Sequence, residues 1–486
     1  MRLNYINMDS KYMMKYRKEI DGLRALAVMP VLFFHAGFNV FSGGYVGVDI
    51  FFVISGFLIS SIILKEQATG SFSIINFYER RARRILPALF LIMLCCIPFA
   101  ILWMWPDEIK RFFASILATS FFSSNILFYL QSGYFETGAE LKPLLHTWSL
   151  AVEEQFYIVF PLFMILVWRF GFKFVGISIL LITLGSLFLS EWASVTHPQA
   201  NFYLPVTRAW ELFVGVLCAL YIYKKGVPKE GWISELAGVT GVILILIAIF
   251  TFDKGTAFPG FSALLPVIGT GLILLFSHTK TYVAKALSFP GFVGIGLISY
   301  SAYLWHHPLF AFARIKSLNE PGAIVYMFLI MLSLFLAYLS WRFVEQPFRK
   351  KEKVTRKQIF IFSLCGMFIF SSIGTLGYTT HIFNRSLNAF QQSIYEVKHN
   401  RIGFNTTDGR ECSDNHQCVI GDTGKPLSIA LIGDSHAGHL IHNLDELLIE
   451  KGLSAKTLTD ADIYMEEFPD FYPKNERFNK AAKERM

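Results

Sequence analysis

Charged residues are scarce in this sequence. Only 16% of the 486 residues are Asp, Glu, Lys or Arg, whereas a soluble domain usually carries about 25%. Hydrophobic residues make up 53% of the chain, and the sequence contains 49 phenylalanines. Such a composition excludes an ordinary soluble protein. We therefore predict a polytopic membrane protein whose apolar surface mostly faces membrane lipid or neighbouring helices.

The sequence also lacks a basic domain, a cleavable signal peptide and an internal repeat. Its formal charge of +8 comes from basic residues beside apolar runs, at Arg80–Arg84 and Arg349–Lys357, which we interpret as short loops. Basic residues beside membrane spans usually mark the cytoplasmic side and interact with anionic lipid headgroups. We therefore expect no nucleic-acid partner. The stretch "MKYRKEIDG" enters an apolar run without a small-residue cleavage site, which predicts a retained cytoplasmic terminus.

Cysteine is scarce too, at six residues. Four lie in apolar runs and are interpreted as core filler: Cys95, Cys96, Cys218 and Cys365. Cys412 and Cys418 lie in the polar stretch "ECSDNHQC", and outside the cytoplasm they favour a small-loop disulfide. A metal site with His416 is the alternative, but it offers three nearby ligands where structural zinc takes four. We assign no metal site and no permanently bound cofactor.

Apolar runs long enough to cross a bilayer begin near residues 22, 45, 85, 111, 148, 172, 206, 233, 260, 292, 322 and 358. If the basic loop Arg349–Lys357 is inside, the Lys-poor stretch Glu191–Pro205 falls outside. Spans counted forward from a cytoplasmic N-terminus give the same topology only if Ile85–Leu130 crosses the membrane once. We therefore predict an all-α fold of about eleven spans, with part of Ile85–Leu130 re-entrant, tilted or packed inside the protein.

This topology places the C-terminus outside the cytoplasm. We expect a cytoplasmic N-terminus at residues 1–20 and a membrane domain at 21–380. An extracytoplasmic linker follows at 381–425, and a partial α/β domain at 426–486.

Ionisable side chains inside the predicted spans are the functional candidates, because lipid penalises them unless they face a cavity or a partner. Asp21 with Arg24, and Arg208 with Glu211, are spaced as i,i+3 pairs that could instead neutralise each other structurally. The full set is Arg24, His35, Asp49, Glu153, Glu154, Arg208, Glu211, His306, His307, Arg342 and Glu345.

Arg24 and His35 lie eleven positions apart, hence on one helix face and about 16 Å from each other along the axis. Ser149, Glu153 and Tyr157 step by four and form a polar stripe typical of a cavity lining. A guanidinium near the cytoplasmic end attracts phosphates, and a deeper imidazole in mid-membrane can take a proton or hold an acyl group. This pattern indicates group transfer from a cytosolic donor, and equally a proton-coupled transporter.

Seven stretches between Asp21 and Arg349 together resemble the membrane acyltransferase-3 family, which O-acetylates bacterial surface glycans. They occur in the family's order and cover essentially the whole membrane domain. The stretches are "DGLRALAVMPVLFFHAGF", "GYVGVDIFFVISGFLIS", "FYERRARRILPAL", "LLHTWSLAVEEQFY", "TRAWELFVG", "ISYSAYLWHHPLF" and "WRFVEQPFR".

The resemblance implies acetyl-CoA as the donor, with His35 as the catalytic histidine and Arg24 as its motif partner. Glu153 falls on the family's motif glutamate, and His306 on its motif histidine, whereas His307 stands where the family commonly has tryptophan. The arginines implied near the donor are Arg80, Arg81, Arg83 and Arg84. The other motif positions are Asp49, Ser55, His146, Trp148, Ser149, Tyr157, Arg208, Glu211 and Glu345.

The tail stretch "LSIALIGDSHAGHLIHNL" predicts a buried strand, a tight turn at Gly433 and a helix start. It resembles the first block of the SGNH-type esterase fold, which implies Ser435 as an acyl-accepting nucleophile near a helix N-terminus. The Asp-x-x-His of that fold does not follow, and the later histidines are His436, His439 and His442. We expect either a shortened domain or a second chain that completes the site.

These features predict an O-acetyltransferase of the bacterial plasma (inner) membrane. Its acceptor would be a hydroxyl of a surface polysaccharide, namely lipopolysaccharide, exopolysaccharide or peptidoglycan. A secondary transporter or glycan-lipid flippase is the alternative, although the inverted repeats typical of transporters are not visible. An inactive or regulatory membrane protein is the third hypothesis.

Overall fold

A computed structural model describes residues 16–132, 138–253, 255–278, 280–317, 319–380, 382–383, 387, 406–407, 412, 418–432 and 440–458. The chain divides into two compact units, Met1–Arg385 and Ser386–Met486. Each unit is described by itself.

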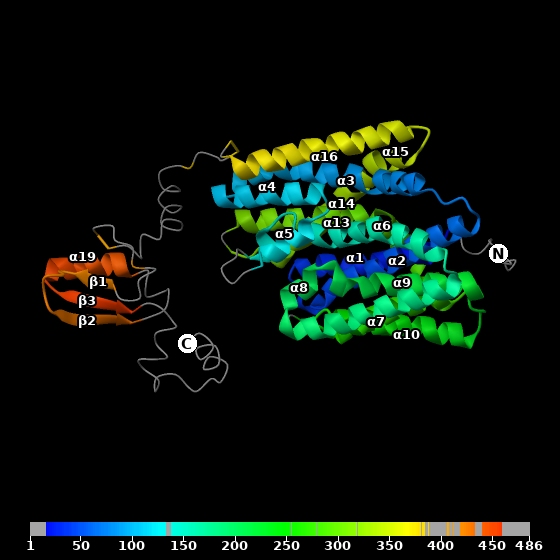
Figure 1. Cartoon of the computed structure of the whole chain (residues 1–486), viewed down its shortest axis with the longest axis horizontal. Coiled ribbons are helices and arrows are strands. Elements are labelled where there is room, and N and C mark those ends of the chain that lie inside the picture. The colour runs from blue at the N-terminus through cyan, green and yellow to red at the C-terminus, as the bar shows by residue number, and fades with distance from the viewer. Residues whose placement is uncertain are drawn as a thin grey trace. The chain divides into compact units, whose positions relative to one another are not determined.

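The first unit is a bundle of helices that run roughly along a common direction (Figure 1). Its helices are α1 (Lys18–His35), α2 (Gly47–Ala68), α3 (Ile74–Trp103), α4 (Pro106–Ser120), α5 (Ser124–Leu130), α6 (Thr147–Trp168), α7 (Phe172–Thr196), α8 (Pro198–Tyr203), α9 (Pro205–Lys225), α10 (Trp232–Thr251), α11 (Leu264–Phe276), α12 (Tyr282–Leu287), α13 (Pro290–Lys316), α14 (Ala323–Ser340), α15 (Gln346–Arg349) and α16 (Arg356–Thr379). A π-helical turn, Trp341–Glu345, joins α14 to α15.

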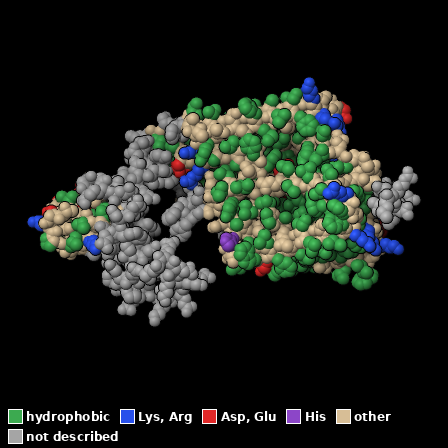
Figure 2. Space-filling view, in the orientation of Figure 1, with side chains coloured by type: hydrophobic (Ala, Val, Ile, Leu, Met, Phe, Trp, Pro, Cys, Tyr) green, Lys and Arg blue, Asp and Glu red, His purple; other side chains and the backbone are tan. Residues whose placement is uncertain are grey.

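Eight helical segments in the described part of the chain are long and apolar enough to cross a bilayer. They contain α2, α3, α6, α7, α9, α10, α14 and α16. Hydrophobic side chains are spread over the visible flank of this unit, with few charged groups among them (Figure 2). The predicted class of membrane protein is therefore confirmed. The number of eleven spans stays a prediction. Helix α1 begins with several charged residues and α11 has only 13 residues, so neither is among the eight segments.

The stretch Ile85–Leu130 contributes one of these eight segments, α3. Its second half forms α4, of 15 residues, and α5, of 7 residues. Helix α4 packs closely along α16, where a Cβ atom at Gly374 or Gly377 would collide with Leu117 or Phe113. This part of the chain therefore lies against protein, which was one of the alternatives expected from the charge pattern.

The basic stretch Arg80–Arg84 is helical, so its interpretation as a loop was wrong. It lies in the first third of α3, which begins at Ile74 after the cap residue Ser73. The hydroxyl of Ser73 accepts a hydrogen bond from the amide of Asn76 (3.4 Å), which satisfies one of the free amides of the first turn. Arginine and alanine are good helix formers, so the stretch continues the apolar helix that follows it.

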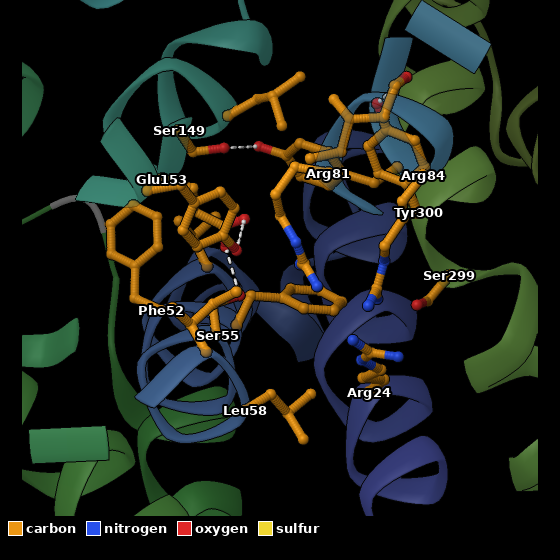
Figure 3. Close-up of a pocket in the computed structure, with 17 residues that line it drawn as sticks. Arg24, Phe52, Ser55, Leu58, Arg81, Arg84, Ser149, Glu153, Ser299 and Tyr300 are labelled. Carbon is orange, nitrogen blue, oxygen red and sulfur yellow. Dashed lines mark hydrogen bonds between the residues drawn. The ribbon is translucent and has the colours of Figure 1, made fainter. Parts of the chain in front are cut away.

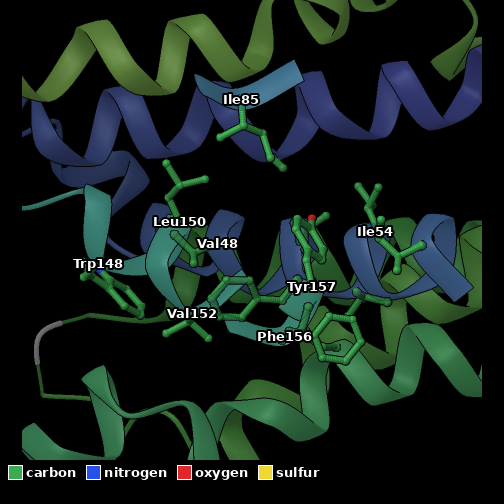
Figure 4. Packing of buried hydrophobic residues seen from close by; sticks show 14 of the residues in the cluster. Val48, Ile54, Ile85, Trp148, Leu150, Val152, Phe156 and Tyr157 are labelled. Atoms are coloured by element: carbon green, nitrogen blue, oxygen red, sulfur yellow. The ribbon is translucent and has the colours of Figure 1, made fainter. Parts of the chain in front are cut away.

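Helices α1, α2, α3, α6 and α13 surround the functional residues, and α9 packs behind α2. Figure 4 shows how apolar side chains such as Val48, Leu150 and Phe156 fill the space between them. Helices α2 and α9 cross closely at Gly56 and Gly215, where an added Cβ atom would meet the backbone of the facing helix. Small residues let membrane helices approach in this way, and the close crossing fixes one wall of the site.

The second unit contains β1 (Cys418–Gly421), β2 (Leu427–Ile432), α19 (Ile441–Lys451) and β3 (Ser454–Leu458). The strand order is β1-β3-β2, with β2 and β3 parallel and β1 antiparallel to β3. Strand β2, helix α19 and the parallel strand β3 form the α/β unit that was predicted from the tail sequence. Among the described residues, β2 lies at the edge of the sheet and exposes Leu427 and Ile429, so this part of the predicted buried strand is exposed.

Candidate active site

A cavity of about 90 Å³ opens among the helices that carry the acyltransferase-like motifs (Figure 3). Five helices supply its charged and hydroxyl groups. Its polar lining comprises Arg24 from α1, Ser55 from α2, Arg81 and Arg84 from α3, Ser149, Glu153 and Tyr157 from α6, and Ser299, Tyr300 and Tyr303 from α13. The polar stripe of α6 therefore faces this cavity.

The carboxylate of Glu153 is held by two hydroxyl donors. Ser55 donates to Oε1 (3.0 Å) and Tyr157 donates to Oε2 (3.2 Å). Tyr157 lies one helical turn after Glu153, whereas Ser55 reaches it from α2. A buried carboxylate with a partner on each oxygen keeps a fixed orientation, so Glu153 presents a localised negative charge to the cavity.

Three guanidinium groups approach the same side of the cavity, those of Arg24, Arg81 and Arg84 (Figure 3). Arg81 lies over the ring of Tyr157, with its Cζ 5.6 Å from the ring centroid, and its Nε is buried without a hydrogen-bond partner among the described residues. Three positive charges face one carboxylate in the lining, so the cavity carries an excess of positive charge and favours an anion.

Asp21 is the local partner of Arg24. One carboxylate oxygen lies 3.4 Å from the Nη1 atom of Arg24, and the other accepts a hydrogen bond from Tyr16 (2.6 Å). Burial, followed by the nearby Asp21, raises the pKa of Tyr16 to about 12, so this phenol remains a donor at neutral pH. The expected i,i+3 pair therefore exists, and Arg24 still lines the cavity.

Arg80 and Arg83 do not line the cavity, although the resemblance implied both near the donor. Arg80 pairs with Glu66 (3.0 Å), and Arg83 pairs with Glu79 (2.9 Å) and donates to the carbonyl of Phe348 (2.9 Å). Successive helical residues point about 100° apart, so one basic stretch serves two purposes. Arg81 and Arg84 face the cavity, while Arg80 and Arg83 join α3 to its neighbours.

His35 lies outside the cavity, at the last residue of α1. Helix α1 ends eleven residues after Arg24, and the mid-membrane position of His35 stays a prediction. The His35 ring is 5.4 Å from that of His306 and 5.2 Å from that of His307, measured between centroids. His146, just before α6, is 5.4 Å from His307 and 5.8 Å from His306. Four histidines thus form one cluster.

Tyr303 joins the cavity to the histidine cluster. Its hydroxyl shares a hydrogen bond with Ser149 (2.7 Å) and donates to the backbone carbonyl of His146 (3.1 Å). Its ring lies 5.3 Å from that of His306, while another side lines the cavity. The sequence analysis did not name Tyr303, because a tyrosine in an apolar helix resembles core packing. Its position three residues before His306 was the available signal.

Several other motif residues form structural contacts. Arg208 pairs with Asp49 (3.3 Å) and Glu211 (3.2 Å), and all three are buried. Trp148 is one of four aromatic rings around this guanidinium, at 5.5 Å. Glu345 accepts a hydrogen bond from Ser301 (2.6 Å) and pairs with Arg349 (2.5 Å). These groups neutralise charges inside the bundle, and they do not line the cavity.

Cys412 and Cys418 form a disulfide in the second unit, the pairing that the sequence favoured. Ser435 lies outside the described residues, and so do Gly433 and His416. Sequence spacing does not indicate that His35, His146, His306 and His307 lie together, and the metal site weighed for His416 also falls outside the described residues.

The site is thus an arginine-lined cavity that adjoins a histidine cluster inside a bundle of apolar helices, an arrangement that can hold an anion beside several imidazoles. Comparison with known proteins identifies the class of the protein. Residues 17–342 match an acyltransferase domain, and residues 404–486 match an SGNH domain of the kind that is fused to such domains. The chain therefore belongs to the acyltransferase-3 family, a family that includes O-acetyltransferases.

Three relatives illustrate the similarity. A Staphylococcus aureus (strain MRSA252) protein named "Putative O-acetyltransferase SAR0937" is 32% identical over 87% of this chain and 74% of its own length. The peptidoglycan O-acetyltransferase OatA of Listeria monocytogenes is 31% identical over 70% of this chain and 57% of its own length. The O-acetyltransferase OatA of Staphylococcus aureus (strain NCTC 8325) is 31% identical, over 72% and 60%. The chain thus spans less than two thirds of either OatA protein. No solved structure matches.

Proposed function

We propose that the protein transfers an acetyl group from acetyl-CoA to a hydroxyl of a cell-surface polysaccharide. The observation that carries this proposal is the pair of adjoining sites along α1. Arg24, Arg81 and Arg84 make one site positive, and the second site contains His35. The two sites match the two ends of acetyl-CoA. Its phosphates lie at one end of the pantetheine arm, and its thioester lies at the other end.

In this proposal the phosphates bind the three arginines from the cytoplasmic side. Arg24 and His35 lie about 16 Å apart along α1, so an extended pantetheine arm accounts for their separation. The arm would pass Ser149 and Tyr303, which lie where the two sites meet. Glu153 orients the polar groups of the cavity and tempers its positive charge.

The chemical step can follow either of two routes. In the direct route, His35 takes the proton of the acceptor hydroxyl, whose oxygen forms the new ester bond while the C–S bond of the thioester breaks. The coenzyme leaves as a thiolate and takes up the proton. In the relayed route, His35 attacks the thioester carbonyl, so an N–C bond forms while the C–S bond breaks and the coenzyme leaves as a thiolate, which takes up the imidazole proton. An acceptor hydroxyl then attacks the acetyl group, and its proton returns to His35 as the N–C bond breaks. Ser435 is the proposed further carrier on the extracytoplasmic side.

Peptidoglycan is the first acceptor to test, because it is the glycan named for the Listeria relative. Lipopolysaccharide and exopolysaccharide are the other candidates. We further propose that the protein lies in the bacterial plasma membrane, with its N-terminus in the cytoplasm and its second unit outside.

The test uses the purified full chain in lipid nanodiscs, with release of free coenzyme A thiol as the readout. The wild-type protein should release thiol when a glycan acceptor is added, and His35→Ala should lower the rate about 100-fold or more. His197→Ala is the matched control, since His197 is exposed at the end of α7. Thiol release unaffected by His35→Ala, or glycan transport without thiol release, would contradict the proposal.

A further inference from the structure

The histidine cluster has a second property that acetyl transfer does not use. One ring nitrogen from each of His35, His306 and His307 lies within 4.8 Å of the other two. His306 and His307 are completely buried, and His35 is partly exposed. Two of the three residues are neighbours on α13, and the third ends α1.

The hydrogen bonds of the cluster determine which nitrogens carry lone pairs. Nδ1 of His306 lies 2.6 Å from the carbonyl oxygen of Tyr303, and Nε2 of His307 lies 3.1 Å from the carbonyl oxygen of Lys142. A carbonyl oxygen only accepts, so these nitrogens are the donors. In a neutral imidazole the other nitrogen is then an acceptor. Nε2 of His306 and Nδ1 of His307 are therefore available as ligands.

Those two nitrogens, and Nδ1 of His35, are buried without a hydrogen-bond partner among the described residues. Three neighbouring buried nitrogens without hydrogen-bond partners lower the stability of a folded protein. A backbone carbonyl behind a histidine ring is also the usual outer support of a metal-ligating histidine, because it fixes the tautomer and the ring orientation.

A buried arginine and two exposed carboxylates lie beside the cluster. Arg314 donates to the backbone carbonyl of His35 (2.6 Å), and its charge is offset by two carboxylates, those of Glu140 (3.1 Å) and Glu320 (2.8 Å). These three groups together carry one excess negative charge. The partly exposed edge of His35 gives an ion a route of entry.

We propose that His35, His306 and His307 bind one divalent transition-metal ion, with zinc as the best fit. Imidazole nitrogens suit zinc, which takes four ligands in a tetrahedral arrangement at about 2.0–2.1 Å. His146 adjoins the rings of His306 and His307 but is not one of the three residues whose ligand atoms lie within 4.8 Å of one another, so the fourth ligand would be a water molecule. The ion would occupy the Nδ1 lone pair of His35, so Nε2 of the metal-bound ring carries the proton and donates, and the direct route of acetyl transfer uses the metal-free ring.

This proposal goes beyond acetyl transfer, and its test measures metal rather than activity. The full chain in detergent is stripped with a chelator, loaded with Zn²⁺, desalted and analysed by elemental mass spectrometry. We expect roughly one zinc ion per wild-type chain. His306→Gln with His307→Gln should lower the affinity for zinc at least about tenfold, whereas His197→Ala should leave the zinc content unchanged.

A size-exclusion profile shows whether the double variant is folded, and the single variant His307→Gln replaces it if it is not. Loading with Co²⁺ gives a second readout, because tetrahedral cobalt has intense visible absorption that the His307→Gln variant should weaken. Absence of retained zinc in the wild-type protein would overturn the proposal, and so would equal zinc retention in the folded histidine variants. Neither result depends on whether acetyl-CoA is the donor.

Discussion

Arg81 and Arg80 are adjacent in the chain and have different surroundings. Arg81 lines the cavity over the ring of Tyr157, whereas Arg80 forms an ion pair with Glu66 between α3 and α2. The sequence alone could not separate them, because both belong to one basic stretch and the direction of each side chain depends on which helices pack around α3. Only the tertiary packing shows which arginines can contact an anionic donor.

This difference predicts the kinetics of arginine variants. Replacing Arg81 or Arg84 by Gln should raise the KM for acetyl-CoA about 10- to 100-fold, because each loses a hydrogen bond between charged groups worth about 1.5–3 kcal/mol. Arg80→Gln removes the same charge from the same helix outside the cavity and should change KM less than threefold. Steady-state kinetics on the three purified variants provide the measurement. Equal effects at all three positions would mean that only the total charge of the stretch matters.

Glu153 should show the opposite kinetic pattern. The substitution Glu153→Gln keeps the size of the side chain and removes the one carboxylate that faces three guanidinium groups. The cavity becomes more positive, so the KM for acetyl-CoA should not rise. The kcat should fall about tenfold or more, because the charged partner of Ser55 and Tyr157 is lost.

Glu154→Gln is the matched control for this experiment, since Glu154 is a buried neighbour that does not line the cavity. The assignment of Glu153 as a positioning residue fails if Glu153→Gln raises KM and leaves kcat unchanged, or if Glu154→Gln has the same effect on kcat.

At the scale of the elements, the crossing of α2 and α9 explains how one wall of the cavity is kept in place. Gly56 and Gly215 let the two backbones approach each other. Their positions bring Ser55, on α2, within hydrogen-bonding distance of Glu153 on α6. The close crossing therefore acts on the site, although neither glycine lines the cavity.

Filling this crossing should destabilise the bundle. Gly215→Leu places a side chain where the backbone of α2 lies, and overpacking of this kind costs about 1–3 kcal/mol or more. Thermal unfolding in detergent, followed by tryptophan fluorescence, should therefore show a lower Tm. Gly185→Leu on α7 is the matched control, because nothing lies within 4 Å of a Cβ atom there. An unchanged Tm for Gly215→Leu would show that the two helices separate without cost.

The elements also show what the sequence predicted well. Apolar runs located most of the long helices, since length and hydrophobicity decide which segments can cross a bilayer. The spacing of four between Ser149, Glu153 and Tyr157 predicted the cavity face of α6. The interpretation of Arg80–Arg84 as a loop failed because charge suggested an exposed turn, while ion pairs with acidic residues on α2 and within α3 allow these arginines to be helical.

At the scale of the whole molecule, the convergence of four histidines from three regions of the chain was not predictable. His35 and His306 are 271 positions apart in the sequence, and periodicity says nothing about contacts between distant helices. The resemblance to a family supplied roles for single residues. The resemblance did not indicate that His35 lies among other histidines.

The proposed orientation of the molecule can be tested by cysteine labelling in intact cells. The background replaces the free cysteines by alanine: Cys95, Cys96, Cys218 and Cys365. A cysteine at the exposed position Glu450 of α19 should react with a membrane-impermeant maleimide, because the second unit is expected outside. A cysteine at the exposed Lys353, between α15 and α16, should react only after lysis. Labelling of both positions, or of Lys353→Cys alone, in intact cells would contradict this topology.

The contacts of Tyr303 have a consequence for any long substrate. Its hydroxyl bonds to Ser149 and to the carbonyl of His146, while its ring lies beside that of His306. The side chain therefore stands between the cavity and the histidines. A molecule that extends from Arg24 to His35 has to displace the Tyr303 ring or thread past it.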